Sequence, residues 1–572
     1  MVRAAAGAWP RTDDDLADWG TSMSDTPLQR EYAQHLVEEA RKGRMTRRQL
    51  LVRASVVGLS ATAAGRILAA CGGEETTSTA SPTATVSPKV GGTLKVGMVS
   101  PIVALDPTTM YDTGSIAITQ QVAEYLIWVN NDLTLRPVLA EKWEPDATAE
   151  NWTFHLRQGV TFQHGKPFGA DDVVATMDIL LDPKTVSAAL SSFQGILSKG
   201  GVEKVDDSTV VFHLDQAFAD FPYLVASTNY DCLILPSDYK AGTWQKNPVG
   251  TGPFMLTEYK PKQSATLKKN PKYWQQGLPY LDGVQVVFNE ETQAQALALQ
   301  AGSIDMMLIT PVHGSQALFS DPNVTVLTTP STMHRELHMR VDRKPFTDKR
   351  VRQALAWTLD RPALVEAVLK GKGEVANDNV FFTLYPLAPQ DLPQRDKDIA
   401  KAKQLLADAG YPDGIDMDLT VEQFEEIPQY ATLLQAMAKE AGINVKTNLV
   451  TVSYYYGSGK NQPWLEVPMG ITDWTFRGIP AQYYLPAFTS KGVWNSSHFK
   501  NAQFDKLAVD FETTLDEASR RTIAKQAAEL LLDETPAIIP YTISVNRATR
   551  KNVNGVTADP AEYLDLTKAF LA

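Results

Sequence analysis

Three patterns in the sequence place residues at spacings that could support chemistry. His334, Glu336 and His338 alternate, so on a strand their side chains would share one face, where a metal ion could bind. No fourth ligand is suggested, and we interpret the pattern as a solvated strand face that holds no metal. Gly250 and Gly252 resemble a phosphate-binding loop only superficially, because the Gly-x-x-x-x-Gly-Lys spacing is absent, and we interpret them as turn residues.

The third pattern surrounds Cys71. The run Leu68-Ala69-Ala70-Cys71 follows the twin arginines Arg47 and Arg48 and a short, weakly apolar stretch, an order that is typical of an exported lipoprotein. Signal peptidase would cut before Cys71, and its thiol would carry a diacylglycerol. Cys232, beside an apolar run, is expected to be a small buried residue. Two cysteines exclude a disulfide framework and a cysteine-based zinc site within one chain.

The N-terminal region is predicted to direct export rather than to fold. Residues 1–70 are assigned to a twin-arginine lipoprotein signal region, and residues 71–90, rich in Thr, Ser, Ala, Pro and Gly, to a flexible tether. A coil of about 19 residues spans roughly 24 Å. Because residues 1–44 include three consecutive aspartates, we expect translation to start at Met45 or Met23. The body is predicted to lie outside the cytoplasmic membrane, anchored to its outer face by the lipid, in the periplasm or at the cell surface.

Composition narrows the class of protein. The chain has 572 residues, of which 44% are hydrophobic, so a mostly disordered chain is excluded and several domains are possible. The formal net charge is −12, and no basic tract is present, which disfavours nucleic-acid binding. No uncharged apolar run reaches the ~18 residues of a membrane-spanning helix.

Strand and helix patterns alternate along the body and predict an α/β fold. Trp152, Phe154 and Leu156 alternate on a strand and are interpreted as core residues. Asp348 is predicted to cap a helix that continues to Leu369, with Arg350 and Arg352 forming ion pairs near its start. Other expected elements are a strand at 93–98, a helix over 116–129, helices over 399–408 and 430–441, and two late helices over 504–516 and 517–532.

Nine segments in a fixed order resemble the extracytoplasmic solute-binding proteins of ABC importers, in the large peptide/nickel-type family, family 5. The resemblance implies an α/β, two-lobed periplasmic-binding-protein-like fold of type II, with an extra subdomain in lobe I and a hinge between the lobes. It assigns lobe I to 91–134, 248–338 and 548–572, the extra subdomain to 135–247, and lobe II to 339–547. The segments are Asp106-Pro107, 139–143, 152–157, 165–172, 250–254, 270–274, 345–352, 354–361 and 402–411.

The resemblance also nominates ligand-binding residues. In peptide-binding members a strand ending Met-Gly-Trp-x-x-Asp supplies a carboxylate for the ammonium group of the peptide. The matching run is Met469-Gly-Ile-Thr-Asp473-Trp474, in which the carboxylate comes one residue early and Trp474 occupies its register. Arg477 is either a clamp for a carboxylate or a surface residue, Tyr484 and Trp494 either stack on the solute or pack in the core, and Tyr111 and Ser115 are nominated from lobe I.

The leading function is capture of a solute between two lobes and its delivery to the transmembrane subunits of an ABC permease, by a protein that is not an enzyme and needs no cofactor. A monomer is expected. Peptide, oligosaccharide, nickel chelate and other amine- or sugar-bearing solutes all remain open. The alternatives are an exported hydrolase, for which the sequence has no Gly-x-Ser-x-Gly or His-Glu-x-x-His, and a ligand-sensing module for a receptor.

We expect Cys71→Ser to abolish retention of the protein in the membrane fraction, because serine offers no thiol for a lipid. Sedimentation of membranes from cells that express the full chain measures this. Cys232→Ser is the matched control and should sediment with membranes. A Cys71→Ser protein that still sediments would contradict lipid anchoring at this residue.

Overall fold

The structure is a computed structural model that describes residues 87–457 and 461–572. The predicted signal region, Cys71 and most of the predicted tether lie outside the described residues. Within those two ranges, no helix combines the length and the apolar character needed to cross a membrane.

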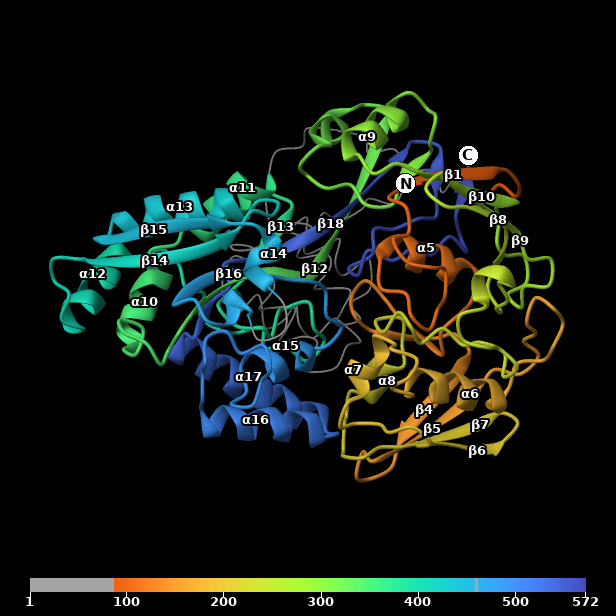
Figure 1. Ribbon diagram of the computed structural model, residues 1–572, viewed down its shortest axis with the longest axis horizontal. Helices are drawn as coiled ribbons and strands as arrows, with labels where there is room; N and C mark the ends of the chain where they lie inside the picture. Colours follow the sequence, from red (N-terminus) through yellow and green to blue (C-terminus); the bar gives the residue numbers. More distant parts are fainter. Residues whose placement is uncertain (1–86, 458–460) are drawn as a thin grey trace, which may run out of the picture. The chain divides into compact units, whose positions relative to one another are not determined.

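The largest element is a twelve-stranded mixed sheet (Figure 1) with the strand order β15-β14-β16-β12-β18-β11-β1-β10-β9-β8. Two further short strands pair at its middle, β13 with β18 and β17 with β12. Because β12 and β18 are long and lie in the middle of the order, both halves of the sheet depend on them. Their bounds are Val324–Met339 for β12 and Tyr541–Arg550 for β18.

One half of the sheet belongs to the part predicted as lobe I. Strand β1 runs parallel to β10 and β11, and β9 and β8 continue antiparallel. Its interior is built from alternating apolar residues such as Leu94 and Val96. The elements are β1 Thr93–Met98, α5 Thr113–Val122, β8 Phe254–Lys260, β9 Ser264–Lys269, β10 Gly283–Phe288, α9 Thr292–Gln300 and β11 Met306–Met307, with the short pairs β2 Ile127–Val129 and β3 Leu135–Pro137, and β19 Val553–Asn554 and β20 Phe570–Leu571.

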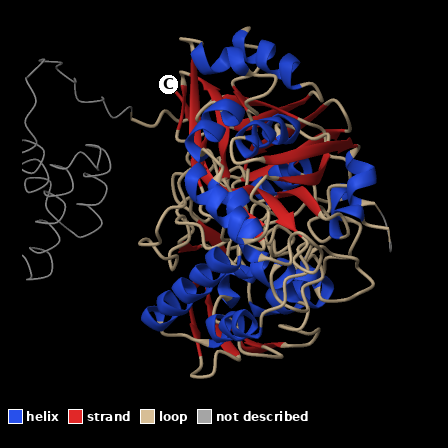
Figure 2. Ribbon diagram, turned by 90° about the vertical axis from the view of Figure 1, so that its left-hand side faces the viewer, coloured by secondary structure: helices blue, strands red, loops and turns tan. Residues whose placement is uncertain are grey.

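The other half belongs to the part predicted as lobe II. Leu337, Leu419 and Ile471 on one face of its strands pack with α10 to α13 in a single apolar core. Helices and strands alternate along the chain here, as the sequence predicts. Figure 2 shows helices packed beside the strands of the large sheet. The elements are α10 Lys349–Trp357, α11 Arg361–Leu369, β13 Gly373–Val375, α12 Ile399–Asp408, β14 Ile415–Glu422, α13 Ile427–Lys439, β15 Ile443–Val450, α14 Val452–Tyr456, β16 Met469–Trp474, α15 Ala481–Ala487, α16 Ala502–Thr513, α17 Glu517–Glu534 and β17 Ala537–Ile538.

A separate four-stranded antiparallel sheet, β4-β5-β7-β6, lies within the segment predicted as the extra subdomain. Trp152, Phe154 and Leu156 are buried, which confirms their interpretation as core residues. Phe154 packs edge-on against Phe212, with ring centroids 4.9 Å apart. The elements are β4 Ala140–Pro145, β5 Asn151–Leu156, α6 Ala170–Leu180, α7 Ala189–Phe193, β6 Val202–Asp206, β7 Thr209–His213 and α8 Phe221–Leu224.

The chain passes from one half of the large sheet to the other along β12. Its register against β18 shifts between Pro330 and His334, and from His334 onward it also pairs with β16. The residues at the shift form hydrogen bonds with both predicted lobes. Ser331 Oγ donates to Pro560 O in the lobe I segment at 2.6 Å, and Thr332 Oγ1 donates to Arg477 O in the lobe II segment at 2.9 Å. This changeover precedes the predicted lobe boundary at 338/339, and the domain boundaries themselves stay predictions.

Two helix predictions are wrong in extent. The helix expected over 116–129 ends at Val122, because Ala123 is extended and Ile127–Val129 instead pairs with β3. The single helix expected from Asp348 to Leu369 is two helices, since Asp360 caps α11 by accepting from Ala363 N at 3.0 Å. Pro362 in the first turn of α11 reinforces that start.

Several smaller interpretations are confirmed. Asp348 caps α10, and its carboxylate pairs with Arg350 at 2.6 Å. Cys232 is buried. Gly250 and Gly252, interpreted as turn residues, lie in the irregular segment before β8, with a bend at Gly252. The structure adds a reason for both glycines: a Cβ on Gly250 would lie 2.2 Å from Val122 O, and one on Gly252 would lie 2.7 Å from Gln121 O.

Asp378 joins three segments of the lobe II half. It pairs with Arg361 at 2.7 Å and with Arg395 at 2.8 Å, and its Oδ1 accepts from Ile539 N at 3.0 Å. All three charged side chains are at least nine-tenths buried. Removing one member of a buried ion-pair group leaves uncompensated charge, which costs far more than removing an exposed pair.

We expect Asp378→Asn to destabilise the protein by about 3–5 kcal/mol, because two buried guanidinium groups lose their carboxylate. Asp360→Asn, which keeps a good capping residue at the start of α11, should change stability by less than about 0.5 kcal/mol. Urea denaturation followed by circular dichroism compares the two midpoints. Equal midpoints would contradict a structural role for the buried triad.

Candidate functional site

The carboxyl end of β16 gathers most of the nominated lobe II residues. Trp474 is buried, and its ring stacks nearly parallel to His334 with centroids 6.2 Å apart. Trp494 packs against Trp474 at 5.9 Å while 41% of it remains exposed. The two indoles therefore form an aromatic surface with one solvent-facing member.

Asp473 lies next to Trp474 and belongs to an acidic group. The hydroxyl oxygen of Tyr456, at the end of α14, lies within hydrogen-bond distance of Glu422 Oε1, at 2.9 Å, and of Asp473 Oδ1. Glu422 is the last residue of β14 and is fully buried. Burial, followed by the charge of Asp473, raises the pKa of Glu422 to about 8.

Arg335, the cation that faces this acidic group, already forms ion pairs with other carboxylates. Arg335, which lies opposite Asp473 in the β12–β16 pairing, binds Glu426 through Nε at 2.8 Å and Glu425 through Nη2 at 3.2 Å. Asp473 and Glu422 therefore have no cation of their own within salt-bridge distance among the described residues.

Arg477 follows in the loop after β16. Its guanidinium donates to Thr475 Oγ1 at 2.8 Å and to Phe476 O at 2.9 Å, and in the described part of the chain it pairs with no carboxylate. Its backbone is held firmly: Arg477 N donates to Thr332 Oγ1 at 3.1 Å, and Tyr385 donates to Arg477 O at 2.9 Å. A half-buried, uncompensated guanidinium on a fixed loop can bind a carboxylate.

The remaining nominated residues lie elsewhere. Tyr111, just before α5, is 58% exposed. Ser115 is fully buried, and its hydroxyl donates to Asp112 Oδ2 at 2.7 Å within the N-terminal cap of α5. Tyr484 is also fully buried: its hydroxyl donates to Glu512, and its ring stacks on Phe381 at 5.6 Å. Of the two interpretations of Tyr484, the geometry is that of core packing.

The interpretation of His334, Glu336 and His338 as a solvated face is wrong, although their shared direction is as predicted. All three are buried on the face of β12 opposite the α10–α13 core. Burial lowers the pKa of both histidines to about 3 and raises the pKa of Glu336 to about 8, so all three are neutral near pH 7. Within residues 87–457 and 461–572, no three His, Cys, Asp or Glu side chains are placed to hold a metal ion.

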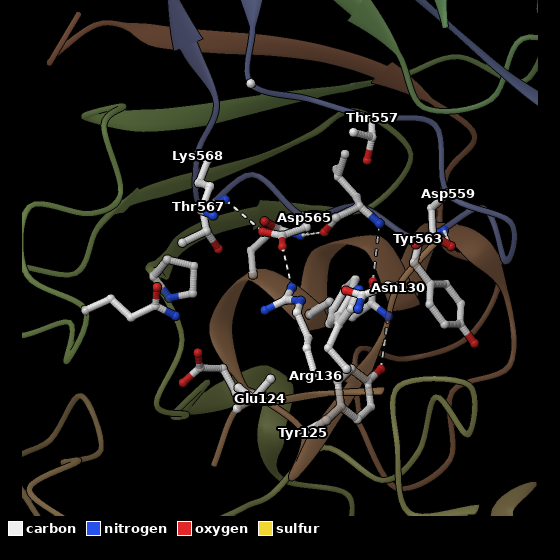
Figure 3. Close-up of a pocket in the computed structure, with 18 of the residues that line it drawn as sticks. Glu124, Tyr125, Asn130, Arg136, Thr557, Asp559, Tyr563, Asp565, Thr567 and Lys568 are labelled. Atoms are coloured by element: carbon white, nitrogen blue, oxygen red, sulfur yellow. Dashed lines mark hydrogen bonds and ion pairs between the residues drawn. The ribbon is translucent and has the colours of Figure 1, made fainter. Parts of the chain in front are cut away.

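Two cavities were not anticipated from the sequence. The first, of about 420 Å³, lies between the end of α5, β2, β3 and the C-terminal segment (Figure 3). Arg136 and Asp565 pair across it at 2.8 Å, and burial raises the pKa of Glu124 on its wall to about 7. Thr251, Tyr273 and Trp274 each donate to the Glu124 carboxyl group.

The second cavity, of about 380 Å³, adjoins the point where β12 changes partner. Pro330, Ser331 and Thr542 line it from the long strands, and the loop over 374–394 encloses it. None of the seven nominated ligand residues lines either cavity. These cavities depend on contacts between distant segments, and the sequence carries no local pattern for them.

Comparison with known proteins identifies the chain. The model for "Bacterial extracellular solute-binding proteins, family 5 Middle" matches residues 134–496. The chain belongs to family 5 of the bacterial extracellular solute-binding proteins. The predicted function, solute capture for an ABC importer outside the cytoplasmic membrane, is confirmed at this level, as is the two-lobed α/β fold.

The relatives of this family 5 protein differ in what they bind. It is 32% identical to heme-binding protein A of Haemophilus influenzae, over 78% of this chain and 86% of that protein. It is 28% identical to glutathione-binding protein GsiB of Escherichia coli K12, over 80% and 91%.

Solved structures agree with the fold. HbpA2 from Haemophilus parasuis has a TM-score of 0.75 at 25% identity and covers 84% of this chain and all of that one. The oligopeptide-binding protein AppA from Bacillus subtilis, solved with a nonapeptide, has a TM-score of 0.63 at 26% identity over 85% and 100%.

Proposed function

We propose that the protein captures an amine-bearing solute, a peptide or a related compound, between its two lobes and delivers it to an ABC permease. The observation that carries the proposal is the acidic group of Glu422 and Asp473 at the end of β16, for which the described part of the chain supplies no cation within salt-bridge distance. An ammonium group removed from water needs such a carboxylate partner.

The loop after β16 adds a second charge of opposite sign. Arg477 lies four residues beyond Asp473, and its guanidinium has no carboxylate partner among the described residues. A carboxylate on one side and a guanidinium on the other suit a solute that carries both an amine and a carboxylate. Trp494, partly exposed and packed against Trp474, adds an aromatic surface at this end of β16.

Closure of the lobes is supported by the way the chain crosses between them. The register shift in β12 concentrates irregular backbone at Ser331–Met333, where a change of direction is least costly. On another face, Arg520 on α17 forms a bidentate ion pair with Asp220 in the predicted extra subdomain, at 2.8 and 2.5 Å. Such contacts between segments assigned to different lobes would form or break as the lobes move.

The relatives support a peptide-like solute without fixing it. The names of two of them, glutathione-binding protein and oligopeptide-binding protein, describe compounds with an amine and a carboxylate.

We further propose that a lipid on Cys71 holds the protein at the outer face of the membrane, and that it works as a monomer.

We expect Asp473→Asn to weaken binding of tri-alanine by about 2 kcal/mol or more, roughly a 30-fold rise in Kd, because the ammonium loses a desolvated carboxylate. Isothermal titration calorimetry at neutral pH measures the Kd. Asp418→Asn, an exposed position on the neighbouring β14, is the matched control and should bind like the unaltered protein. Equal affinities for both variants would remove Asp473 from the site.

A bound solute should also stabilise the folded protein, by about 2.7 kcal/mol at a concentration 100 times its Kd. Thermal denaturation in the presence of peptides, oligosaccharides and metal chelates measures this. A panel without any shift in Tm would contradict solute capture, and turnover of a panel member would favour the exported hydrolase.

A further inference from the structure

A single hydroxyl group lies between two carboxyl groups at the ends of β14 and β16. Tyr456 Oη is within hydrogen-bond distance of Glu422 Oε1 and of Asp473 Oδ1, and it accepts from Asp473 N at 3.3 Å. A phenol has one proton to donate, so it cannot donate to both carboxyl groups. Both hydrogen bonds exist together only if one carboxyl group carries a proton and donates it to Tyr456 Oη.

The proton belongs on Glu422. Its side chain is fully buried, and its Oε2 has no hydrogen-bond partner in the described part of the chain, whereas Asp473 is partly exposed. An ionised carboxylate in that position would be desolvated without a cation, which is very costly. Arg335 does not compensate it, because its guanidinium is engaged by Glu425 and Glu426.

The titratable groups that face Glu422 agree with this assignment. They are Asp473 on β16, Tyr456 and Tyr455 on α14, and Arg335 on β12. Burial and the two carboxyl groups raise the pKa of Tyr456 far above its ordinary value, so the phenol keeps its proton. The charge of Arg335 opposes the rise in the pKa of Glu422, but burial and Asp473 outweigh it.

Two further acidic side chains continue the group: Glu425 is close to Asp473, and Glu562 is close to Glu425. Glu425, in the loop between β14 and α13, has a left-handed backbone with φ of 41°. Glu562, in the C-terminal segment, has φ of 65°; burial and then the charge of Glu425 raise its pKa to about 7. Two acidic residues are thus held in an uncommon conformation near one another, one from each predicted lobe. Among the described residues, no cation other than Arg335 is placed to compensate this group, and Arg335 is paired with Glu425 and Glu426.

We propose that Glu422 and Asp473 hold one proton between them through Tyr456, and that a cationic group of the solute replaces this proton on binding. In the exchange the O–H bond of the Glu422 carboxyl group breaks, the proton passes to water, and two carboxylates face one ammonium or guanidinium group. The exchange step rests on the proposed function. Because binding releases a proton, the Kd for the solute should fall as pH rises.

Infrared spectroscopy of the solute-free full chain tests the proton itself. The difference between the unaltered protein and Glu422→Gln should contain a protonated-carboxyl band at about pH 6.5 that is lost as pH rises through about 8. Glutamine has the shape and charge of the protonated acid, so this variant is expected to fold. Absence of that band at pH 6.5 would overturn the proposal, whatever binds.

Calorimetry with tri-alanine tests the exchange, at about pH 5.5 to 6.5, where its amino group stays protonated. The Kd should fall about tenfold over that unit of pH, and titrations in two buffers of different ionisation enthalpy should show about one proton released. In Glu422→Gln the Kd should be flat and no proton released. Glu512→Gln should behave like the unaltered protein, since Glu512 is another buried glutamate bonded to a tyrosine, with its pKa raised to about 8.

The outcomes separate the two proposals. If tri-alanine binds with a flat Kd and releases no proton, the exchange is overturned and the proposed function stands. If tri-alanine does not bind at any pH in this range, the amine-bearing solute of the proposed function is overturned together with the exchange, and the infrared band alone decides whether the pair holds a proton.

Discussion

The pairing of β12 with β18 is the interaction on which both halves of the molecule depend. These two strands lie in the middle of the large sheet, and each contributes to both sets of neighbours. The register shift after Pro330 divides β12 into two parts, one in each half of the sheet. Such an irregularity lets the strand bend, so the angle between the two halves can change. Because β16 is placed by its pairing with β12, the position of Asp473 and Trp474 follows from the same contact. A solute held there would bear directly on the segment that joins the halves.

The period of two residues along these strands separates a structural face from a chemical one. Leu337 and Ile471 enter the apolar core with α10 to α13, while Glu336 and Thr472 face the other way. Burial of that second face keeps its histidines and Glu336 neutral near pH 7. Charge in the candidate site lies at the end of β16, at Asp473 and Arg477, and in the pairing of Arg335 with Glu425 and Glu426.

The sequence predicts the class of fold and many of its elements, because periodicity and capping are local. The strand at Trp152–Leu156 and the helix Ile399–Asp408 are examples. It fails where a distant contact overrides a local preference: the helix after Thr113 stops at Val122, next to the Glu124 carboxyl group bound by Thr251, Tyr273 and Trp274. The sequence could not assign Tyr484 to the core for a similar reason, because its hydrogen-bond partner Glu512 lies on another helix, α16.

Asp473 comes one residue before the position that the resemblance implies for a binding carboxylate, and its surroundings show why a motif alone does not place such a side chain. In an uninterrupted strand, a shift of one residue turns a side chain to the opposite face. Asp473 lies at the strand end, where Tyr456 reaches its side chain and its backbone N–H from α14. Glu422 arrives through the parallel pairing of β14 with β16, which aligns Val421 with Ile471. Three residues from separate elements thus build one acidic group. The charge of this acidic group depends on how many protons its three side chains hold. The residue type at position 473 alone therefore does not determine which solute the group would bind.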